Sequence, residues 1–436
     1  MNELYIIIVF LFVLFTLLGT GVWVGLALMG VAMFALELFA SGPTGDRMDT
    51  TIWAASSSWT LTALPMFIWM GEILYRTRLS EDMFRGLSPW MARLPGGLVH
   101  TNIVGCTVFA AVSGSSAATL TTVGKMSIPE LKKRNYPEHL VIGSLAGAAT
   151  LGLMIPPSLV LIVFGVTLNL SITKLFFAGI LPGLVLALMF MTYVAAYASI
   201  SKNWAPIADP MMSLAEKIKN SRFLIPVFIL IFVVIGSMYG GYATATEAAA
   251  FGVIGALLLA LGQGSLTWKS FSESLIGATK TSAMIALILA GAAFLSLAMG
   301  FTGLPRALAD GIATLELTRF ELLMVLLVFY IILGMFLDGI SSVVLTMAVV
   351  EPMVREAGID MIWFGIFVVV VVEMAQITPP IGFNLFVLQG MTQHEMGYIA
   401  KAALPMFLIM VLMVFVLIWF PELATWLPDN IRQGPG

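Results

Sequence analysis

Long runs of apolar residues are the feature of this sequence that most limits its fold. The runs Leu4–Leu18, Val22–Ala40 and Ala403–Phe420 approach or reach the ~20 residues that a helix needs to cross a hydrocarbon layer of about 30 Å. Of the 436 residues, 60% are hydrophobic and 10% are charged, whereas soluble proteins carry roughly 25% charged residues. A soluble core cannot bury so many apolar side chains, so we predict an all-α polytopic membrane protein.

Polar breaks divide the sequence into ten candidate membrane helices, five in each half. They lie near residues 4–18, 21–40, 53–75, 141–164, 176–199, 223–239, 243–262, 274–300, 361–388 and 399–420. The first run lacks the basic start of a secretory signal and continues into the second through Gly19-Thr20-Gly21. We therefore expect it to remain as a membrane helix.

Two further apolar stretches, residues 98–130 and 321–352, are interrupted at their centres. The interruptions are Ser113-Gly114-Ser115-Ser116 and Gly334-Met335-Phe336-Leu337-Asp338-Gly339. Each flank of about 15 residues makes only ~22 Å of helix, which is short for a span. We predict two re-entrant hairpins, whose polar tips must be buried in protein or line a wet cavity.

The two halves repeat one another at a spacing of 223 residues. Pro129, Pro156, Pro157 and Pro182 recur at this spacing as Pro352, Pro379, Pro380 and Pro405. The same spacing pairs Ser115 with Asp338 and Thr119 with Ser342, so the two predicted tips correspond. We infer two copies of one structural unit.

The placement of basic residues indicates that the second copy is inverted. Four basic residues follow the first hairpin within residues 125–134, whereas Arg355 stands alone among acids after the second. Basic loops remain in the cytoplasm. Cytoplasmic segments at 76–93, 125–139, 201–222, 262–273 and 389–401 would hold 14 basic residues, against six on the other side. We therefore predict two inverted-topology repeats with both termini outside.

Broken helices at corresponding positions of inverted repeats are typical of transporters with a site near the middle of the membrane. A half-helix that begins at Ser115-Ser116 directs free N–H groups at this site and favours a carboxylate, while the arm that ends there offers carbonyl oxygens to a cation such as Na⁺. Pro156-Pro157 and Pro379-Pro380 free further carbonyls in the preceding turns. Because hard cations prefer oxygen ligands, we predict two cation sites related by the repeat.

Four polar residues are further candidates. An ionisable group inside a membrane is functional by default, and Asp338 lies at the second tip, although a structural carboxylate is the alternative. Glu373 precedes the second proline pair, and Asn384 follows it with an amide that could bond a substrate. For Glu247 we expect a structural hydrogen bond between scaffold helices. Neither tip nor break contains Arg or Lys, so helix ends, hydroxyls and bound cations would have to meet an anionic substrate.

At these positions the sequence resembles the large membrane subunit of tripartite ATP-independent periplasmic (TRAP) transporters, the DctM family. Four motifs carry the resemblance and span nearly the whole chain. They are SGSSAAT at 113–119, IPPS at 155–158, TATEAAA at 244–250 and EMAQITPPIGFN at 373–384.

The resemblance implies an elevator-type, Na⁺-coupled importer of the bacterial inner membrane, with about two Na⁺ sites and no enzymatic activity. It implies two partners, a small four-helix membrane subunit of the DctQ type and a periplasmic substrate-binding protein of the DctP type. The chain begins at its first membrane helix, so we expect the small subunit to be a separate polypeptide. Family substrates are small organic anions such as C4-dicarboxylates, other carboxylates, sialic acids and sulfonates. Scattered basic residues give no reason to expect a nucleic-acid partner.

The resemblance also implies ligand residues. One Na⁺ site would use Ser113, Ser116, Gly152, Ile155 and Pro157, and the other Gly334, Asp338, Thr378 and Pro380. Substrate would lie near Ser115, Thr119, Asp338 and Asn384.

Repeats and resemblance together predict a division of the chain. Scaffold helices occupy 1–75 and 223–300, arm segments 76–97 (cytoplasmic) and 301–320 (periplasmic), a cytoplasmic linker 201–222 and a C-terminal tail 421–436. The transport domain combines 98–200 with 321–420, each holding a hairpin, a broken helix and a following helix.

Three alternatives remain open at this stage. A stand-alone anion carrier of two-hairpin design would need no binding protein. Protons could replace Na⁺ as the coupling ion through Asp338. A membrane-embedded enzyme with Asp338 and Glu373 as a carboxylate pair would explain neither the duplication nor the two proline breaks.

Overall fold

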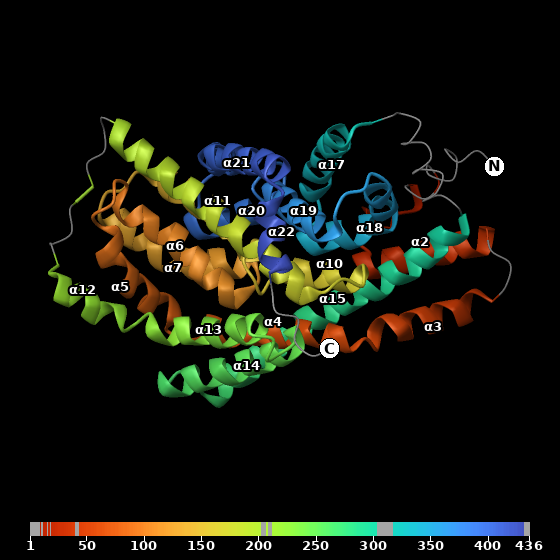
Figure 1. Ribbon diagram of the computed structural model, residues 1–436, viewed down its shortest axis with the longest axis horizontal. Coiled ribbons are helices and arrows are strands. Elements are labelled where there is room, and N and C mark those ends of the chain that lie inside the picture. The colour runs from red at the N-terminus through yellow and green to blue at the C-terminus, as the bar shows by residue number, and fades with distance from the viewer. Residues whose placement is uncertain are drawn as a thin grey trace.

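The computed structural model of the protein describes residues 9, 12–14, 16–17, 19–39, 43–201, 206–207, 212–302 and 317–430. These residues form helices and connecting turns, with no β-strand among them (Figure 1). Five helices of this part are long and apolar enough to cross a membrane, and one bent pair would raise the number to six. The predicted class, an all-α polytopic membrane protein, is confirmed.

The helices follow one another with short connections. In the first half they are α2 (Val24–Phe39), α3 (Thr44–Ser56), α4 (Ala63–Tyr75), α5 (Leu79–Met91), α6 (His100–Ser113), α7 (Ser116–Lys133), α8 (Glu138–Ala149), α9 (Leu151–Met154), α10 (Leu159–Thr167) and α11 (Ile172–Ile200). In the second half they are α12 (Leu214–Ser221), α13 (Ile225–Tyr239), α14 (Ala245–Gly262), α15 (Trp268–Thr302), α17 (Arg319–Gly334), α18 (Gly339–Glu356), α19 (Met361–Gln376), α20 (Phe383–Thr392), α21 (Met396–Trp419) and α22 (Glu422–Asp429).

The order of elements repeats along the chain. A shift of 223 residues carries α7, residues 116–133, onto 339–356, the bounds of α18. The same shift carries the first residue of α8, 138, onto 361, where α19 begins. We call α6 to α10 the first unit and α17 to α20 the second unit, because each consists of a hairpin followed by a helix that is interrupted at a proline pair.

The two units pack against one another reciprocally. The second arm of the first hairpin, α7, contacts α20, and the second arm of the second hairpin, α18, contacts α10. Glycines allow both approaches: a Cβ on Gly124 of α7 would lie 2.8 Å from the Met391 side chain, and one on Gly339 would lie 3.5 Å from that of Val160. Each hairpin thus rests on the half-helix that follows the break of the other unit.

Helix α19 lies at the centre of this assembly and is buried along nearly its whole length. This placement explains its continuous apolar sequence, because a helix surrounded by protein has no polar face. Helix α8 packs on α21 through Gly143 and Gly147. A Cβ at these positions would lie 2.2 Å from the Ala402 carbonyl oxygen and 2.6 Å from the Met406 Cβ, so this Gly-x-x-x-Gly spacing serves helix packing.

Six of the described helices outside the two units form a second layer. Helix α15 contacts α2, α3 and α4, and α14 contacts α4 and α13, which together lie along one side of the molecule (Figure 1). Large apolar side chains on this layer face outward, among them Phe232, Leu258 and Trp268. In water such a surface would drive aggregation, whereas in a bilayer it contacts lipid tails.

Several helix bounds differ from the sequence-based expectation. The span predicted at 53–75 is divided, because α3 begins at Thr44 with polar residues and ends at Ser56, and α4 starts only at Ala63. The predicted tail at 421–436 contains α22, which packs on α11. Most of the helix expected at 4–18 and most of the arm segment at 301–320 lie outside the described residues, although residues 9, 12–14 and 16–17 are described as helical.

Capping boxes set the start of three helices, and one of them corrects the role expected for Glu247. The Glu247 carboxylate accepts hydrogen bonds from the Thr244 amide and hydroxyl, both at 2.8 Å, and caps its own helix α14. The same pattern starts α12 at Ser213 and α17 at Thr318. The bond is structural, as expected, but it lies within one helix instead of between two, because the Thr-x-x-Glu spacing satisfies the free N-terminal amides locally.

Candidate functional site

The tip of the first hairpin is a tight turn held by hydroxyl groups. Gly114 takes a left-handed φ of +64° after the end of α6, a conformation that glycine adopts without steric cost. Ser115 then caps α7 by accepting a bond from the Ala118 amide. The hydroxyls of Ser113 and Thr119 are 2.8 Å apart, so the end of α6 and the start of α7 are joined beneath the turn.

The first proline break releases the three backbone carbonyls that the resemblance assigns to Na⁺. In an unbroken helix the amide of residue i+4 would bond each carbonyl. Gly152 lacks this donor because residue 156 is a proline, and the Leu159 amide bonds to the Gly114 carbonyl at 3.3 Å instead of reaching Ile155.

The third carbonyl is freed by a side chain. The Leu161 amide, which would bond Pro157 in a helix, donates to the Ser158 hydroxyl at 3.2 Å. That hydroxyl in turn donates to the Leu153 carbonyl, whose own helical donor is missing at Pro157. The oxygens of Gly152, Ile155 and Pro157 are therefore among the carbonyls of this break that lack a helical donor, together with those of Met154 and Pro156. Oxygen ligands of this kind suit a hard cation.

Close backbone contact brings this break onto the first tip. A Cβ on Gly152 would lie 2.8 Å from the backbone of Ser115 and Ser116. A Cβ on Gly114 would lie 2.5 Å from the Pro157 carbonyl oxygen. The five residues predicted for the first Na⁺ site thus come from a tip and a break that touch, and the region is buried.

In the second unit, the tip is organised around Asp338. One carboxylate oxygen accepts bonds from the amides of Ile340 at 3.1 Å and Ser341 at 3.2 Å, and the other accepts from the Ser341 hydroxyl. Asp338 is therefore the N-cap of α18, the position that Ser115 holds in the first unit. It is exposed at the surface of the chain.

The second break lies beside the second tip. The Gln376 side-chain amide donates to the Leu337 carbonyl at 3.4 Å, and a Cβ on Gly334 would lie 2.6 Å from that of Ala375. The Thr378 hydroxyl donates to the Met374 carbonyl at 2.7 Å, which leaves its lone pairs available to a cation. Pro380 is exposed, so the residues predicted for the second Na⁺ site border the surface.

A buried carboxylate connects the two units. The Glu373 side chain is fully buried, and its Oε1 accepts a bond of 2.6 Å from the Ser116 hydroxyl at the first tip. Its Oε2 has no hydrogen-bond partner among the described residues. The sequence marked Glu373 as a candidate but did not reveal this contact. The available signal was an acid inside a continuous apolar helix, which requires a polar partner from elsewhere.

The four residues predicted to contact substrate have different surroundings. Ser115 and Asp338 cap α7 and α18, and Thr119 bonds Ser113. The Asn384 side chain is fully buried on α20, and neither its nitrogen nor its oxygen has a partner in the described part of the chain. Buried amides are normally hydrogen-bonded. An amide that is buried and unpaired next to a broken helix is therefore a candidate position for a polar ligand.

Comparison with known proteins gives matches along the whole chain. A family profile described as "Tripartite ATP-independent periplasmic transporter, DctM component" matches residues 9–423. The C4-dicarboxylate TRAP transporter large permease protein DctM of Pseudomonas aeruginosa is 30% identical over 397 residues, which cover 91% of this chain and 92% of the relative. The isethionate TRAP transporter permease protein DctMQ of Oleidesulfovibrio alaskensis is 29% identical over 417 residues, covering 94% of this chain and 64% of that protein.

A solved structure has the same fold. The crystal structure of the YdaH transporter of Alcanivorax borkumensis, which has an unusual topology, matches with a TM-score of 0.62 at 15% identity. The match covers 94% of this chain and 98% of that one. At this identity the likeness concerns the fold alone.

Proposed function

This chain belongs to the DctM component of the tripartite ATP-independent periplasmic transporters, and from that premise we propose that it imports a small organic anion together with Na⁺. Membership makes it a multi-pass protein of the bacterial inner membrane and a transporter subunit. It also implies a tripartite system with a small membrane subunit and a periplasmic binding protein. Na⁺ coupling, the elevator motion and the substrate class belong to the proposal.

The observation that carries Na⁺ coupling is the set of carbonyls freed at the first break. Gly152, Ile155 and Pro157 have lost their helical donors, and the tip with the Ser113 and Ser116 hydroxyls packs against them. Buried backbone oxygens without donors are costly, and a bound cation would satisfy them. We assign the second Na⁺ to Gly334, Asp338, Thr378 and Pro380, where tip and break also lie side by side.

The substrate would bind between the two tips, near Ser115, Thr119, Asp338 and Asn384. The unpaired Asn384 amide offers donors and an acceptor, and the N-termini of α7 and α18 favour negative charge. Relatives named for C4-dicarboxylates and for isethionate share an acidic group on a small molecule. We therefore propose a small carboxylate or sulfonate.

An elevator motion would move the transport domain, 98–200 with 321–420, past the scaffold, 1–75 with 223–300. The reciprocal packing of α7 on α20 and α18 on α10 supports a single moving body, because each unit is completed by the other. The repeated element order supports the inverted repeat. The arm segments 76–97 and 301–320 and the linker 201–222 would connect the two bodies.

The test is uptake by proteoliposomes that contain the chain, its small DctQ-type subunit and its DctP-type binding protein. Labelled succinate and isethionate would be offered with an inward Na⁺ gradient, an inward proton gradient, or neither. We expect uptake of at least one acid only with Na⁺ and only with the binding protein. Uptake without the binding protein would identify a stand-alone carrier, and uptake driven by protons alone would contradict Na⁺ coupling.

A pair of variants links that result to the first site. Ser116→Ala removes a hydroxyl predicted to hold Na⁺, whereas Ser199→Ala removes an exposed hydroxyl that bonds only the Ala195 carbonyl of its own helix. We expect the first variant to raise the Na⁺ concentration for half-maximal uptake about tenfold, because a lost ligand costs roughly 1–2 kcal/mol. The second variant should behave as the wild type.

A further inference from the structure

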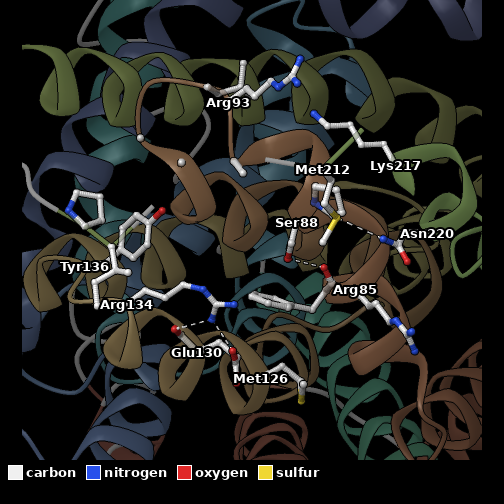
Figure 2. A pocket seen from close by; sticks show the side chains of 18 of the residues that line it. Arg85, Ser88, Arg93, Met126, Glu130, Arg134, Tyr136, Met212, Lys217 and Asn220 are labelled. Atoms are coloured by element: carbon white, nitrogen blue, oxygen red, sulfur yellow. Dashed lines mark hydrogen bonds and ion pairs between the residues drawn. The ribbon is translucent and has the colours of Figure 1, made fainter. Parts of the chain in front are cut away.

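A cavity of about 950 Å³ lies away from both hairpin tips, between the end of α5, residues 92–97, the end of α7 and α12. We call it the arm pocket (Figure 2). All its walls come from the segments around 76–97, 125–139 and 201–222, which the positive-inside rule places in the cytoplasm. The proposed transport site uses none of the lining residues.

The charge of the arm pocket is not balanced. Arg85, Arg93, Arg134 and Lys217 line it together with Glu81 and Glu130. The Glu130 carboxylate pairs with Arg134 and, at 3.1 Å, with Lys133, and these bonds lower the pKa of Glu130, so that it remains ionised. Glu130 is therefore already paired. Of the remaining cations, Arg85 lies near the Asp82 carboxylate, and Glu81 is the other acid among the described lining residues.

Two cations stand together on one wall. Arg93 and Lys217 reach toward the same side of the arm pocket (Figure 2), and neither forms an ion pair with a carboxylate of the described residues. The Lys217 side chain is only 5% exposed and lies with its ammonium 5.6 Å from the centre of the Trp90 ring. Burial and the nearby Arg93 charge lower the pKa of Lys217. Arg93 is exposed, so the pair joins one buried and one exposed cation, and two neighbouring cations favour an anion between them.

A separate apolar groove lies along one face of α13 and starts, in sequence, beside the arm pocket. Helices α12 and α13 meet at an angle of 53°, and a groove of about 520 Å³ along them begins at Ser221, next to the pocket residue Asn220. Its walls are Leu224, Ile225, Phe228, Ile229 and Phe232. Polar donors in the arm pocket and an exposed apolar face that starts next to it in sequence suit a molecule with an anionic head and a hydrocarbon chain.

Helix α12 resembles a helix that lies at the membrane surface. Its position therefore indicates that the arm pocket lies at the level of the lipid headgroups. Leu214 and Ile218 are exposed on it, while Lys217 turns inward. The Trp90 indole donates a bond of 2.9 Å to the Ser221 hydroxyl at the bend, and tryptophan is enriched at the level of lipid headgroups. Amphipathic helices of this kind lie in the plane of the interface.

We propose that the arm pocket binds the phosphate headgroup of an anionic phospholipid from the cytoplasmic leaflet, with one acyl chain in the groove of α13. Arg93, Lys217 and the Asn220 amide would hold the phosphate. The lipid would bridge the arm helix α5 and helix α12 to the end of hairpin arm α7. The binding itself does not depend on Na⁺ coupling or on the elevator motion.

The proposal can be tested by native mass spectrometry of the purified complex released from nanodiscs of phosphatidylcholine doped with phosphatidylglycerol. We expect phosphatidylglycerol to remain bound in preference to phosphatidylcholine. Lys217→Gln and Arg93→Gln should each lower its retention about fivefold, or about 1 kcal/mol, because each loses a direct charged contact with the phosphate. Lys219→Gln, which removes an exposed cation from the same helix outside the pocket, should leave retention unchanged.

Two further measurements distinguish lipid binding from a folding defect and from the binding of a free anion. Lys217→Arg keeps the charge and should retain phosphatidylglycerol, which separates loss of charge from loss of folding. Inorganic phosphate at millimolar concentration should not displace the lipid, because it cannot occupy the groove. Equal retention of both lipids, equal behaviour of Lys217→Gln and Lys219→Gln, or full displacement by inorganic phosphate would overturn the proposal.

Discussion

The tip and break of the first unit are largely buried, whereas those of the second unit lie at the surface. Pro156 and Pro157 are covered on all sides, but Pro379, Pro380 and their neighbour Ile381 are exposed. The second tip is exposed as well, with Phe336 showing 60% of its surface. The same sequence pattern therefore produces a closed unit and an open one. This difference teaches that the local sequence determines the helix caps and the proline breaks. Whether a hairpin tip is buried depends instead on the helices that pack around it.

A redistribution of small residues accompanies this difference. In the first unit the glycine of closest approach, Gly152, lies on the broken helix, and at the equivalent position the second unit has Ala375. In the second unit the glycine lies on the hairpin, as Gly334, where the first unit has Ala111. Gly152 brings the helix against the backbone of Ser115 and Ser116, whereas the nearest neighbour of Gly334 is the Ala375 side chain. The closed unit thus uses a backbone contact and the open unit a side-chain contact.

Gly152→Ala should have the largest effect, because it acts on the closed contact. The added Cβ would lie 2.8 Å from the backbone at Ser115 and Ser116, which cannot rotate away as a side chain can. Overpacking of this kind costs ~1–3 kcal/mol and would push the tip away from the freed carbonyls. We expect Na⁺-dependent uptake in proteoliposomes to fall by more than about a hundredfold.

The matched control for this change is Gly397→Ala. A Cβ at Gly397 meets no atom within 4 Å, so uptake and the apparent Tm in detergent should stay at wild-type values. If Gly152→Ala transports as well as this control, transport does not require the close contact between the first tip and the first break.

Glu373→Ala should have the next largest effect, because it removes the bond that joins the second unit to the buried tip of the first. It leaves the Ser116 hydroxyl buried without its acceptor, at a cost of about 1–3 kcal/mol. The equivalent residue of the first half is Thr150. Its hydroxyl bonds the Gly147 carbonyl and the Met410 sulfur, neither of which belongs to a hairpin tip. We expect about a tenfold to hundredfold loss of uptake and a lower apparent Tm by thermal unfolding of the purified protein.

Glu373→Gln separates the hydrogen bond from the charge. Glutamine can still accept from the Ser116 hydroxyl, so the apparent Tm should remain close to wild type. A rise in the Na⁺ concentration for half-maximal uptake would then assign a role to the negative charge. Unchanged uptake in both Glu373→Ala and Glu373→Gln would contradict the idea that this bridge joins the units.

Asp338 tests the open unit with a smaller expected effect. Asparagine caps helices about as well as aspartate, whereas alanine loses the cap at a cost of ~1 kcal/mol. If Asp338 contributes its charge to Na⁺ or substrate binding, Asp338→Asn should raise the Na⁺ requirement about tenfold while leaving the apparent Tm unchanged, because bonds to charged groups exceed neutral ones by roughly 1.4 kcal/mol. Wild-type uptake in Asp338→Asn would reduce Asp338 to a structural cap.

Much of the fold could be predicted because its signals are local. The proline pairs mark both breaks, Ser115 and Asp338 mark the starts of α7 and α18, and the spacing of 223 residues relates the two. The division of the span at 53–75 could not be read in the same way, since α3 begins with polar residues that no apolar run marks as a helix. The cap at Glu247 differs from the predicted partner, although Thr244 three residues earlier was the available signal.

The site was predictable as residue types but not as contacts. Ser116 and Glu373 are 257 residues apart in sequence, and no local pattern pairs them. Which unit is buried was also hidden, because both carry the same Pro-Pro motif and both are apolar. The side-chain amide of Asn384 has no hydrogen-bond partner among the described residues. This could be recognised only from the structure, because it depends on which side chains of the surrounding helices lie near it.

The smallest expected effect compares one hydroxyl position in the two units. Thr119 bonds the Ser113 hydroxyl at 2.8 Å, whereas the equivalent Ser342 hydroxyl is buried and has no partner among the described residues. Thr119→Val keeps the shape and loses the bond, so the apparent Tm should reflect a loss of about 1 kcal/mol, while Ser342→Ala removes an unsatisfied group at nearly no cost. A loss in Ser342→Ala as large as that in Thr119→Val would mean that Ser342 has a partner, such as an ion, in the working protein, and that the open unit closes during transport.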